Sequence, residues 1–104
     1  MRESDVERHL RDRVRAVGGR AYKWVSPGNN GVPDRIVMLP NAPDIFVELK
    51  APGKKSTALQ LVQHKILREL GRPVIVIDSK EKVDRLIEAY EDGLLEYCIQ
   101  ENAL

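Results

Sequence analysis

Hydrophobic residues recur with the period of an α-helix in three stretches of the chain. The first predicted helix spans residues 3–17, the second runs from a cap at Ser56 or Thr57 to about Leu70, and the third spans residues 80–91. On each helix, one apolar stripe is expected to face the core. These stripes consist of Val6, Leu10, Val14 and Val17; of Leu59, Val62, Ile66, Leu67 and Leu70; and of Val83, Leu86, Ile87 and Tyr90.

Short runs of β-branched and aromatic residues lie between these helices. They predict strands over residues 20–25, 36–39, 45–49 and 73–78, with a turn at residues 40–43. The last run is apolar on both faces and follows a helix, so it is expected to pair in parallel with the strand over residues 45–49. The element order predicts an α/β fold, with a mixed β-sheet flanked by helices as α-β-β-β-α-β-α.

The length of 104 residues is that of a single domain with one modest core. Residues 1–104 are therefore expected to fold as one unit, in which residues 93–104 form a C-terminal tail. This tail carries Leu94, Leu95 and Tyr97 and is too apolar for a disordered end. We expect it to pack on the core or to form a dimer contact with a second subunit.

Composition narrows the class of protein. Hydrophobic residues make up 42% and charged residues 32% of the chain, as in ordinary soluble proteins. No run approaches the roughly 20 apolar residues of a membrane span, and the charged start of the chain does not resemble a signal peptide. Cys98 is alone, which excludes an intrachain disulfide and a cysteine-based zinc site. These features predict a cytoplasmic protein without a membrane partner.

The net charge of +1 conceals an uneven distribution along the chain. Residues 1–55 hold eleven Lys and Arg against seven acids, whereas residues 56–104 hold six against nine. The first half is therefore the basic one, and a site that binds a phosphate backbone is expected there.

Charged residues occupy the ends of two neighbouring predicted strands. Asp34 opens the first strand, and alternation on the second places Phe46, Glu48 and Lys50 on one face. A hairpin with strands about 4.8 Å apart would bring Asp34 close to Glu48 and leave Lys50 beside both. A solvated strand face and a turn-capping Asp are the alternative interpretation. Phe46 and Pro33 favour a half-buried site, where acids without cationic partners usually bind a metal ion.

The spacing of Pro33-Asp34, thirteen further residues and Glu48-Leu49-Lys50 resembles the signature of the restriction-endonuclease-like, or PD-(D/E)XK, nucleases. The flanking strings S-P-G, G-V-P-D-R-I-V, F-V-E-L-K-A-P-G-K and L-Q are similar to the virus-type replication-repair nuclease (VRR-NUC) domain, over roughly residues 1–90. This resemblance implies a restriction-endonuclease-like core and a metal-dependent DNA endonuclease. For small standalone members it also implies homodimers that cut branched DNA such as Holliday junctions, in phage replication and repair.

The resemblance assigns roles to the residues of the signature. Asp34 and Glu48 would hold one or two Mg²⁺ or Mn²⁺ ions, for which carboxylate oxygens are suitable ligands. The backbone carbonyl of Leu49 is a further expected ligand. Lys50 would orient the attacking water or stabilise negative charge on the phosphoryl group.

Helix residues complete the implied site. In this family a first-helix glutamate joins the metal site, which indicates Glu3 or, as the alternative, Glu7, although either could instead complement the helix dipole. Family members also carry a glutamine that orients a ligand or water, and Gln60 matches it; an ordinary helix-surface residue is the alternative. His9 and His64 show no metal-ligand spacing and are expected at the surface.

Polar residues near the expected site are candidates for DNA contacts. The Gly- and Asn-rich loop over residues 26–31 can present N–H groups to a phosphate, although most such loops are only turns. The lysines after the second strand either bind phosphates or are solvated. The predicted nucleic-acid-binding residues are Lys23, Ser26, Gly28, Asn30, Arg35, Lys54 and Lys55. The alternative function is a non-catalytic DNA-binding module of the same fold, and an RNA nuclease would share the metal site.

Overall fold

The computed structural model describes residues 1–102, which form four helices and four strands. The elements are α1 (Glu3–Ala16), β1 (Arg20–Lys23), β2 (Arg35–Met38), β3 (Ile45–Leu49), α2 (Ala58–Glu69), β4 (Val74–Ile77), α3 (Lys80–Glu91) and α4 (Leu95–Asn102). Their order confirms the predicted α/β fold, and the predicted helices and strands end within two residues of the observed ones. Helix α4 was predicted only as an apolar tail, of which residues 103 and 104 lie outside the described residues.

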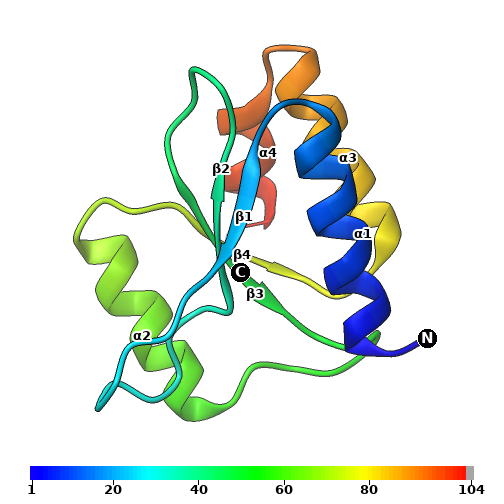
Figure 1. Ribbon diagram of the computed structural model, residues 1–104. Coiled ribbons are helices and arrows are strands. Elements are labelled where there is room, and N and C mark those ends of the chain that lie inside the picture. Colours follow the sequence, from blue (N-terminus) through cyan, green and yellow to red (C-terminus); the bar gives the residue numbers. More distant parts are fainter. Residues whose placement is uncertain (103–104) are drawn as a thin grey trace.

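The four strands form one mixed sheet in the order β1-β2-β3-β4 (Figure 1). β1, β2 and β3 are antiparallel neighbours, whereas β3 and β4 run parallel, as predicted. Parallel strands need a long connection to return the chain to the starting edge, and α2 lies within it. The sheet register aligns Lys23 with Arg35 and Arg35 with Val47, so the end of β1, the start of β2 and the middle of β3 lie side by side.

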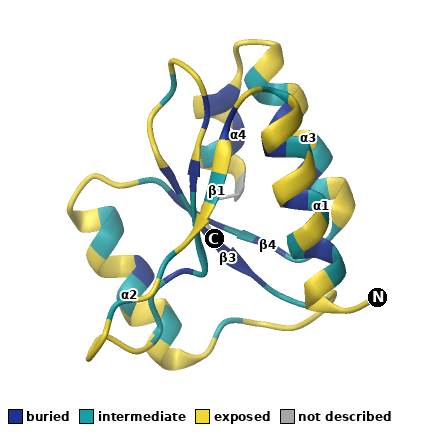
Figure 2. Ribbon diagram, in the orientation of Figure 1, coloured by how far each residue is buried: buried dark blue, intermediate teal, exposed yellow. Residues whose placement is uncertain are grey.

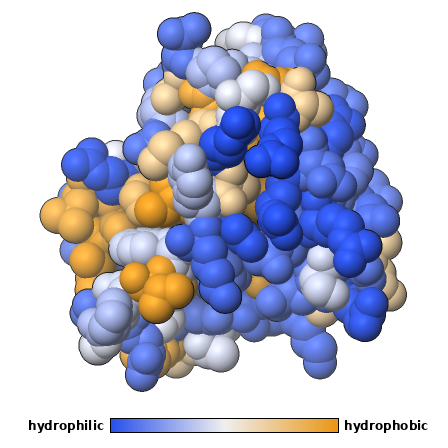
Figure 3. Space-filling model, in the orientation of Figure 1, coloured by the Kyte–Doolittle hydropathy of each residue, from blue (hydrophilic) through white to orange (hydrophobic). Residues whose placement is uncertain are grey.

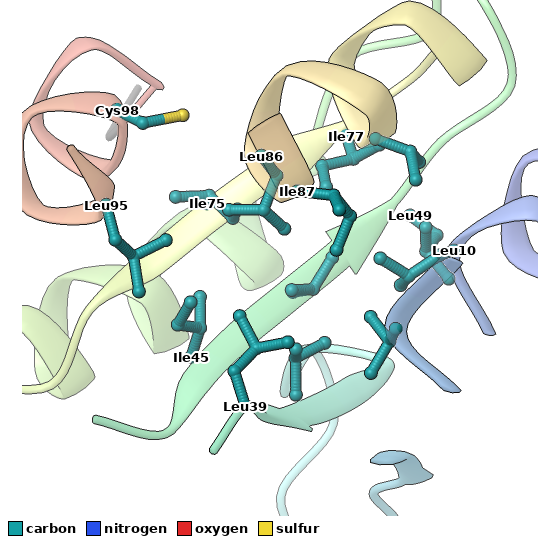
Figure 4. Packing of buried hydrophobic residues seen from close by; sticks show 14 of the residues in the cluster. Leu10, Leu39, Ile45, Leu49, Ile75, Ile77, Leu86, Ile87, Leu95 and Cys98 are labelled. Atoms are coloured by element: carbon teal, nitrogen blue, oxygen red, sulfur yellow. The ribbon is translucent and has the colours of Figure 1, made fainter. Parts of the chain in front are cut away.

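The hydrophobic core lies between one face of the sheet and helices α1, α3 and α4 (Figures 1 and 4). Every second residue of β3 belongs to this core, so the residues between them, Phe46 and Glu48, point to the opposite face. The core residues of the strands and of the first and third helices are Val6, Leu10, Val14, Val37, Ile45, Val47, Leu49, Ile75, Ile77, Val83, Leu86 and Ile87.

Helix α4 adds the C-terminal segment to this core. Leu95 and Cys98 are buried there, whereas Leu94 and Tyr97 are more than half exposed. The tail therefore packs on the rest of the chain through one side only. Within residues 1–102, no helix is both long enough and apolar enough to cross a membrane.

Helix α2 lies on the other face of the sheet, and its apolar stripe points outward, which corrects the predicted orientation (Figure 2). Leu59, Val62, Ile66 and Leu70 were expected in the core, but between 44% and 66% of each residue is exposed. Only Leu67 of the predicted stripe is partly buried. In Figure 3, hydrophobic surface accordingly gathers over α2, at the left of the view.

The side of α2 that faces the sheet is polar. Gln60, His64 and Arg68 follow one another at one-turn intervals and contact β3 or β4, the last through a hydrogen bond of 3.0 Å to the carbonyl of Val74. The cause is Glu48, because a carboxylate buried under a helix needs polar partners from that helix. His64 is fully buried, so its predicted surface position was wrong.

Candidate active site

Two carboxylates meet at the end of the hairpin formed by β2 and β3. The antiparallel register pairs Arg35 with Val47, and one residue further it sets Asp34 opposite Glu48. Residues that lie opposite each other on adjacent strands point to the same face, which here is the face covered by α2. Asp34 Oδ2 also accepts a hydrogen bond of 2.8 Å from the N–H of Leu49, which holds the aspartate against β3.

Glu48 is a buried acid, with 1% of the residue exposed. Burial is the largest cause that raises the pKa of Glu48 to about 7; the hydrogen bond with His64 lowers it, and the adjacent Asp34 carboxyl raises it further. Two ionised carboxylates so close to each other repel. A cation placed between them would remove this repulsion and favour the ionised form of both acids.

Gln60 connects this acid to Lys50. Thr57 caps α2 and accepts a hydrogen bond from the N–H of Gln60 at 3.2 Å. The side-chain oxygen of Gln60 accepts from the N–H of Thr57 at 2.8 Å and from Lys50 Nζ at 2.6 Å. Because both donors occupy the oxygen, the amide nitrogen faces Glu48 Oε2, at 3.4 Å. Gln60 is thus a partner of two site residues and not a solvated helix residue.

His64 contacts the other oxygen of the same carboxylate. Its Nε2 lies 3.4 Å from Glu48 Oε1, and its Nδ1 has no hydrogen-bond partner among residues 1–102. Sequence reasoning missed this contact. The signal that could have found it is the one-turn spacing of Gln60 and His64, which places the histidine on the side of the helix that already carried a predicted site residue.

The first-helix glutamates stand apart from this pair. The pKa of Glu3 is raised, chiefly by partial burial and then by the charge of Asp34, so the two acids interact across space. Glu7 Oε2 instead accepts a hydrogen bond of 3.0 Å from Arg35 Nε. Among residues 1–102, no three His, Cys, Asp or Glu side chains form a group that could hold a metal ion, so the expected cluster of three acids is absent there.

The pair of acids nevertheless has the donor atoms that suit a hard divalent cation. Asp34 forms no ion pair within the described residues, and the only ion-pair contact of Glu48 there is the one with His64. The carboxylate oxygens are thus not blocked by Lys or Arg. Oxygen donors of this kind are the ligands that Mg²⁺ and Mn²⁺ prefer.

Comparison with known proteins identifies the family. No family model matches the chain. A solved structure described as "VRR_NUC domain" superposes with a TM-score of 0.77 and 37% identity, over 85% of this chain and 96% of that one. The chain belongs to the VRR-NUC family. "Putative nuclease p44" from Acyrthosiphon pisum secondary endosymbiont phage 1 is 57% identical over 81 residues, which are 78% of this chain and 87% of that protein.

The predicted DNA-contacting loop of this VRR-NUC domain lies against the start of α2. Gly31 has a φ of 90°, and a Cβ there would come within 2.9 Å of the backbone carbonyl of Leu59, so the contact requires glycine. Asn29 closes the preceding turn with a backbone hydrogen bond of 3.0 Å to Ser26. The loop is therefore next to Gln60, and Figure 1 shows it beside α2.

Arg35 differs from the other predicted DNA contacts. Its side chain is only 13% exposed, and besides Glu7 it binds the carbonyl of Ala21 at 2.9 Å. The guanidinium thus ties α1 to the sheet, and its role as a predicted DNA contact stays a prediction. Ser26 is partly buried, and the remaining predicted contacts are exposed: Lys23, Gly28, Asn30, Lys54 and Lys55.

A basic groove that sequence reasoning missed runs between α1 and β1 of the VRR-NUC domain. Asp12 is the one acid among the residues that line it, and the basic residues there are Arg11, Arg15, Arg20, Lys23 and Arg35. Arg11 and Arg15 are one helical turn apart, where like charges repel. Neither has an ion-pair partner within residues 1–102. Figure 3 shows strongly hydrophilic surface over α1 and β1.

Proposed function

We propose that this VRR-NUC domain is a divalent-metal-dependent endonuclease that hydrolyses phosphodiester bonds in DNA. Membership of the family indicates a nuclease. The observation that carries the finer proposal is the pair Asp34 and Glu48, opposite each other at one strand end with Lys50 and Gln60 beside them. A module that only binds DNA gains nothing from a buried acid whose pKa is raised to about 7, because such an acid opposes folding at neutral pH.

In this proposal Asp34 and Glu48 hold Mg²⁺ or Mn²⁺, with the carbonyl of Leu49 as a further ligand and Glu3 connected through a water molecule. When bound, the ion polarises the phosphoryl oxygen and lowers the pKa of the attacking water. Glu48 must lose its proton to act as a ligand, so metal affinity is expected to increase as the pH rises through about 7.

In this proposal, Lys50 is the cation that interacts with the negative charge of the scissile phosphate. Its Nζ is held at 2.6 Å by the side-chain oxygen of Gln60, and no carboxylate within residues 1–102 forms an ion pair with it. The ammonium can therefore orient the attacking water or stabilise the negative charge that develops in the transition state.

We also propose that the DNA backbone runs from the basic groove to the carboxylates. Lys23 lines the groove, and the next residue, Trp24, donates a backbone hydrogen bond of 2.9 Å to the carbonyl of Asp34. Strand spacing puts the backbone of Lys23 about 10 Å from that of Glu48. The register places the Lys23 side chain on the α1 face of the sheet and Glu48 on the α2 face, so in this proposal the DNA backbone passes around the strand ends to reach the carboxylates. The loop over residues 26–31 and the lysines Lys54 and Lys55 would contact further phosphates.

A homodimer that cuts branched DNA, such as a Holliday junction, is the assembly we propose. The apolar stripe of α1 is buried within the chain and does not offer a surface for this contact. The stripe of α2 that includes Val62 and Ile66 is exposed and is favoured as the contact with a second copy.

Because the similar curated protein comes from a phage, we propose that the reaction takes place in the cytoplasm of a host cell.

Cleavage of linear and branched DNA with Mg²⁺ or Mn²⁺ tests the proposed reaction. The wild-type chain should cut, EDTA should stop it, and Asp34→Asn and Lys50→Ala should each lower the rate by about 100-fold or more. Lys50→Ala should still bind metal, because it removes no ligand. Cutting that survives both substitutions would indicate a contaminant and favour the non-catalytic DNA-binding module. A matched RNA duplex distinguishes a ribonuclease.

A further inference from the structure

The orientation of α2 is not the one that burial of apolar surface alone would select. Val62 and Ile66 remain exposed, while the fully buried residue of the helix is His64. An amphipathic helix normally turns its apolar stripe inward, so the contacts made by the polar side must offset the lost burial. The contacts of that side at the site are with Glu48 and Lys50.

The burial of His64 determines which of its ring nitrogens carries the proton. The Nδ1 atom has no partner among residues 1–102, and a proton there would be a buried donor without an acceptor. Nε2, by contrast, faces Glu48 Oε1 at 3.4 Å. A neutral ring is therefore protonated at Nε2 and donates to the carboxylate. In that state Nε2 has no free lone pair and is not a metal ligand.

Gln60 and His64 hold the two oxygens of one carboxylate from successive turns of α2. The Gln60 amide donates to Oε2 and the His64 ring to Oε1 of Glu48. Both contacts are 3.4 Å long and both come from α2, and the Asp34 carboxyl is the other neighbour of Glu48 at this site. Outer partners of this kind fix the direction in which a ligating carboxylate presents its lone pairs.

We propose that His64 is a positioning residue, which donates through Nε2–H to Glu48 and holds that carboxylate in the orientation in which it and Asp34 bind one divalent cation. This inference rests on the proposed metal site. It adds that tight binding of the ion needs a hydrogen-bond donor at residue 64 in addition to the metal ligands themselves. It predicts that the affinity for the ion depends on a donor at the place of Nε2, not on the volume or the aromatic ring of the histidine.

Isothermal titration calorimetry of the full-length chain with Mn²⁺ at pH 8 measures this affinity in the absence of DNA. His64→Leu should weaken binding by about 10- to 100-fold, as loss of an outer partner typically does. His64→Gln should bind within a few-fold of wild type, because the glutamine amide reaches the place of Nε2. His64→Asn should resemble the leucine variant, because the shorter amide reaches only the place of Nδ1. His9→Leu is the matched control, since His9 contacts Asp84 and not the site.

Unfolding of each variant in EDTA shows whether the fold is kept. If His64→Leu does not fold, the comparison of His64→Gln with His64→Asn decides alone, since both keep a polar amide. Equal Mn²⁺ affinity of wild type and His64→Leu, or of the two amide variants, would overturn the positioning role and leave the nuclease proposal intact. A wild-type chain that binds no Mn²⁺ would overturn both.

Discussion

The carboxylate of Glu48 lies buried opposite that of Asp34, and its pKa is raised from 4.5 to about 7. Below about pH 4.5 the acid is protonated in both the folded and the unfolded chain. Between pH 4.5 and 7 only the unfolded chain releases the proton. The metal-free protein is therefore expected to lose stability as the pH rises through this window, and to lose no more from this group above it.

Urea unfolding in EDTA at pH 5 and pH 8 measures this effect. Replacing Glu48 by Gln should remove a fall of about 2–3 kcal/mol in the free energy of unfolding between these two pH values, since each unit of pKa shift is worth about 1.4 kcal/mol. Glu69→Gln is the matched control, because the side chain of Glu69 is 66% exposed. If the free energies of unfolding of wild type and Glu48→Gln depend on pH in the same way, the pKa of Glu48 is not raised in the folded chain.

The basic groove predicts a specific loss of DNA affinity. Reversing the charge of Arg11 and Arg15 together should weaken binding of duplex DNA at least about 10-fold and reduce the slope of log K against log salt concentration by about 2. Fluorescence anisotropy in EDTA measures binding without cutting. Arg72→Glu with Arg85→Glu changes the net charge equally at exposed positions outside the groove. A similar loss in that control would show a net-charge effect and no groove.

The outward stripe of α2 predicts self-association. Val62 is 53% and Ile66 is 44% exposed, so replacing both by Glu should leave the fold intact but convert a dimer into a monomer. Sedimentation equilibrium at micromolar concentration tests this expectation. Leu94→Glu with Tyr97→Glu is the control on α4, whose exposed apolar residues are not part of the stripe. A wild-type chain that is already monomeric at that concentration would contradict the dimer.

Periodicity predicted those parts of the fold in which apolar residues pack against apolar residues. Helix α3 begins at the predicted residue, after its N-cap Ser79, and buries the predicted Val83, Leu86 and Ile87. The meeting of Asp34 and Glu48 could likewise be predicted, because strand alternation and the antiparallel hairpin are local rules.

Helix α2 shows where the same rule fails. Its ends were predicted within one residue, yet its buried side was not, because the pattern does not show that the sheet beneath it carries Glu48. A buried acid reverses the usual preference and draws Gln60 and His64 inward. The ion pair of Glu7 with Arg35 was missed for a related reason, since it joins residues 28 positions apart that only the tertiary fold brings together.

The most direct measurement of the central claim is anomalous X-ray scattering from crystals of the protein soaked with Mn²⁺ at pH 8. The account predicts a Mn²⁺ peak between Asp34 and Glu48, with carboxylate oxygens of both residues as ligands, and no such peak in Asp34→Asn crystals. A Mn²⁺ peak at other residues, or no peak between Asp34 and Glu48 at saturating Mn²⁺, would contradict it.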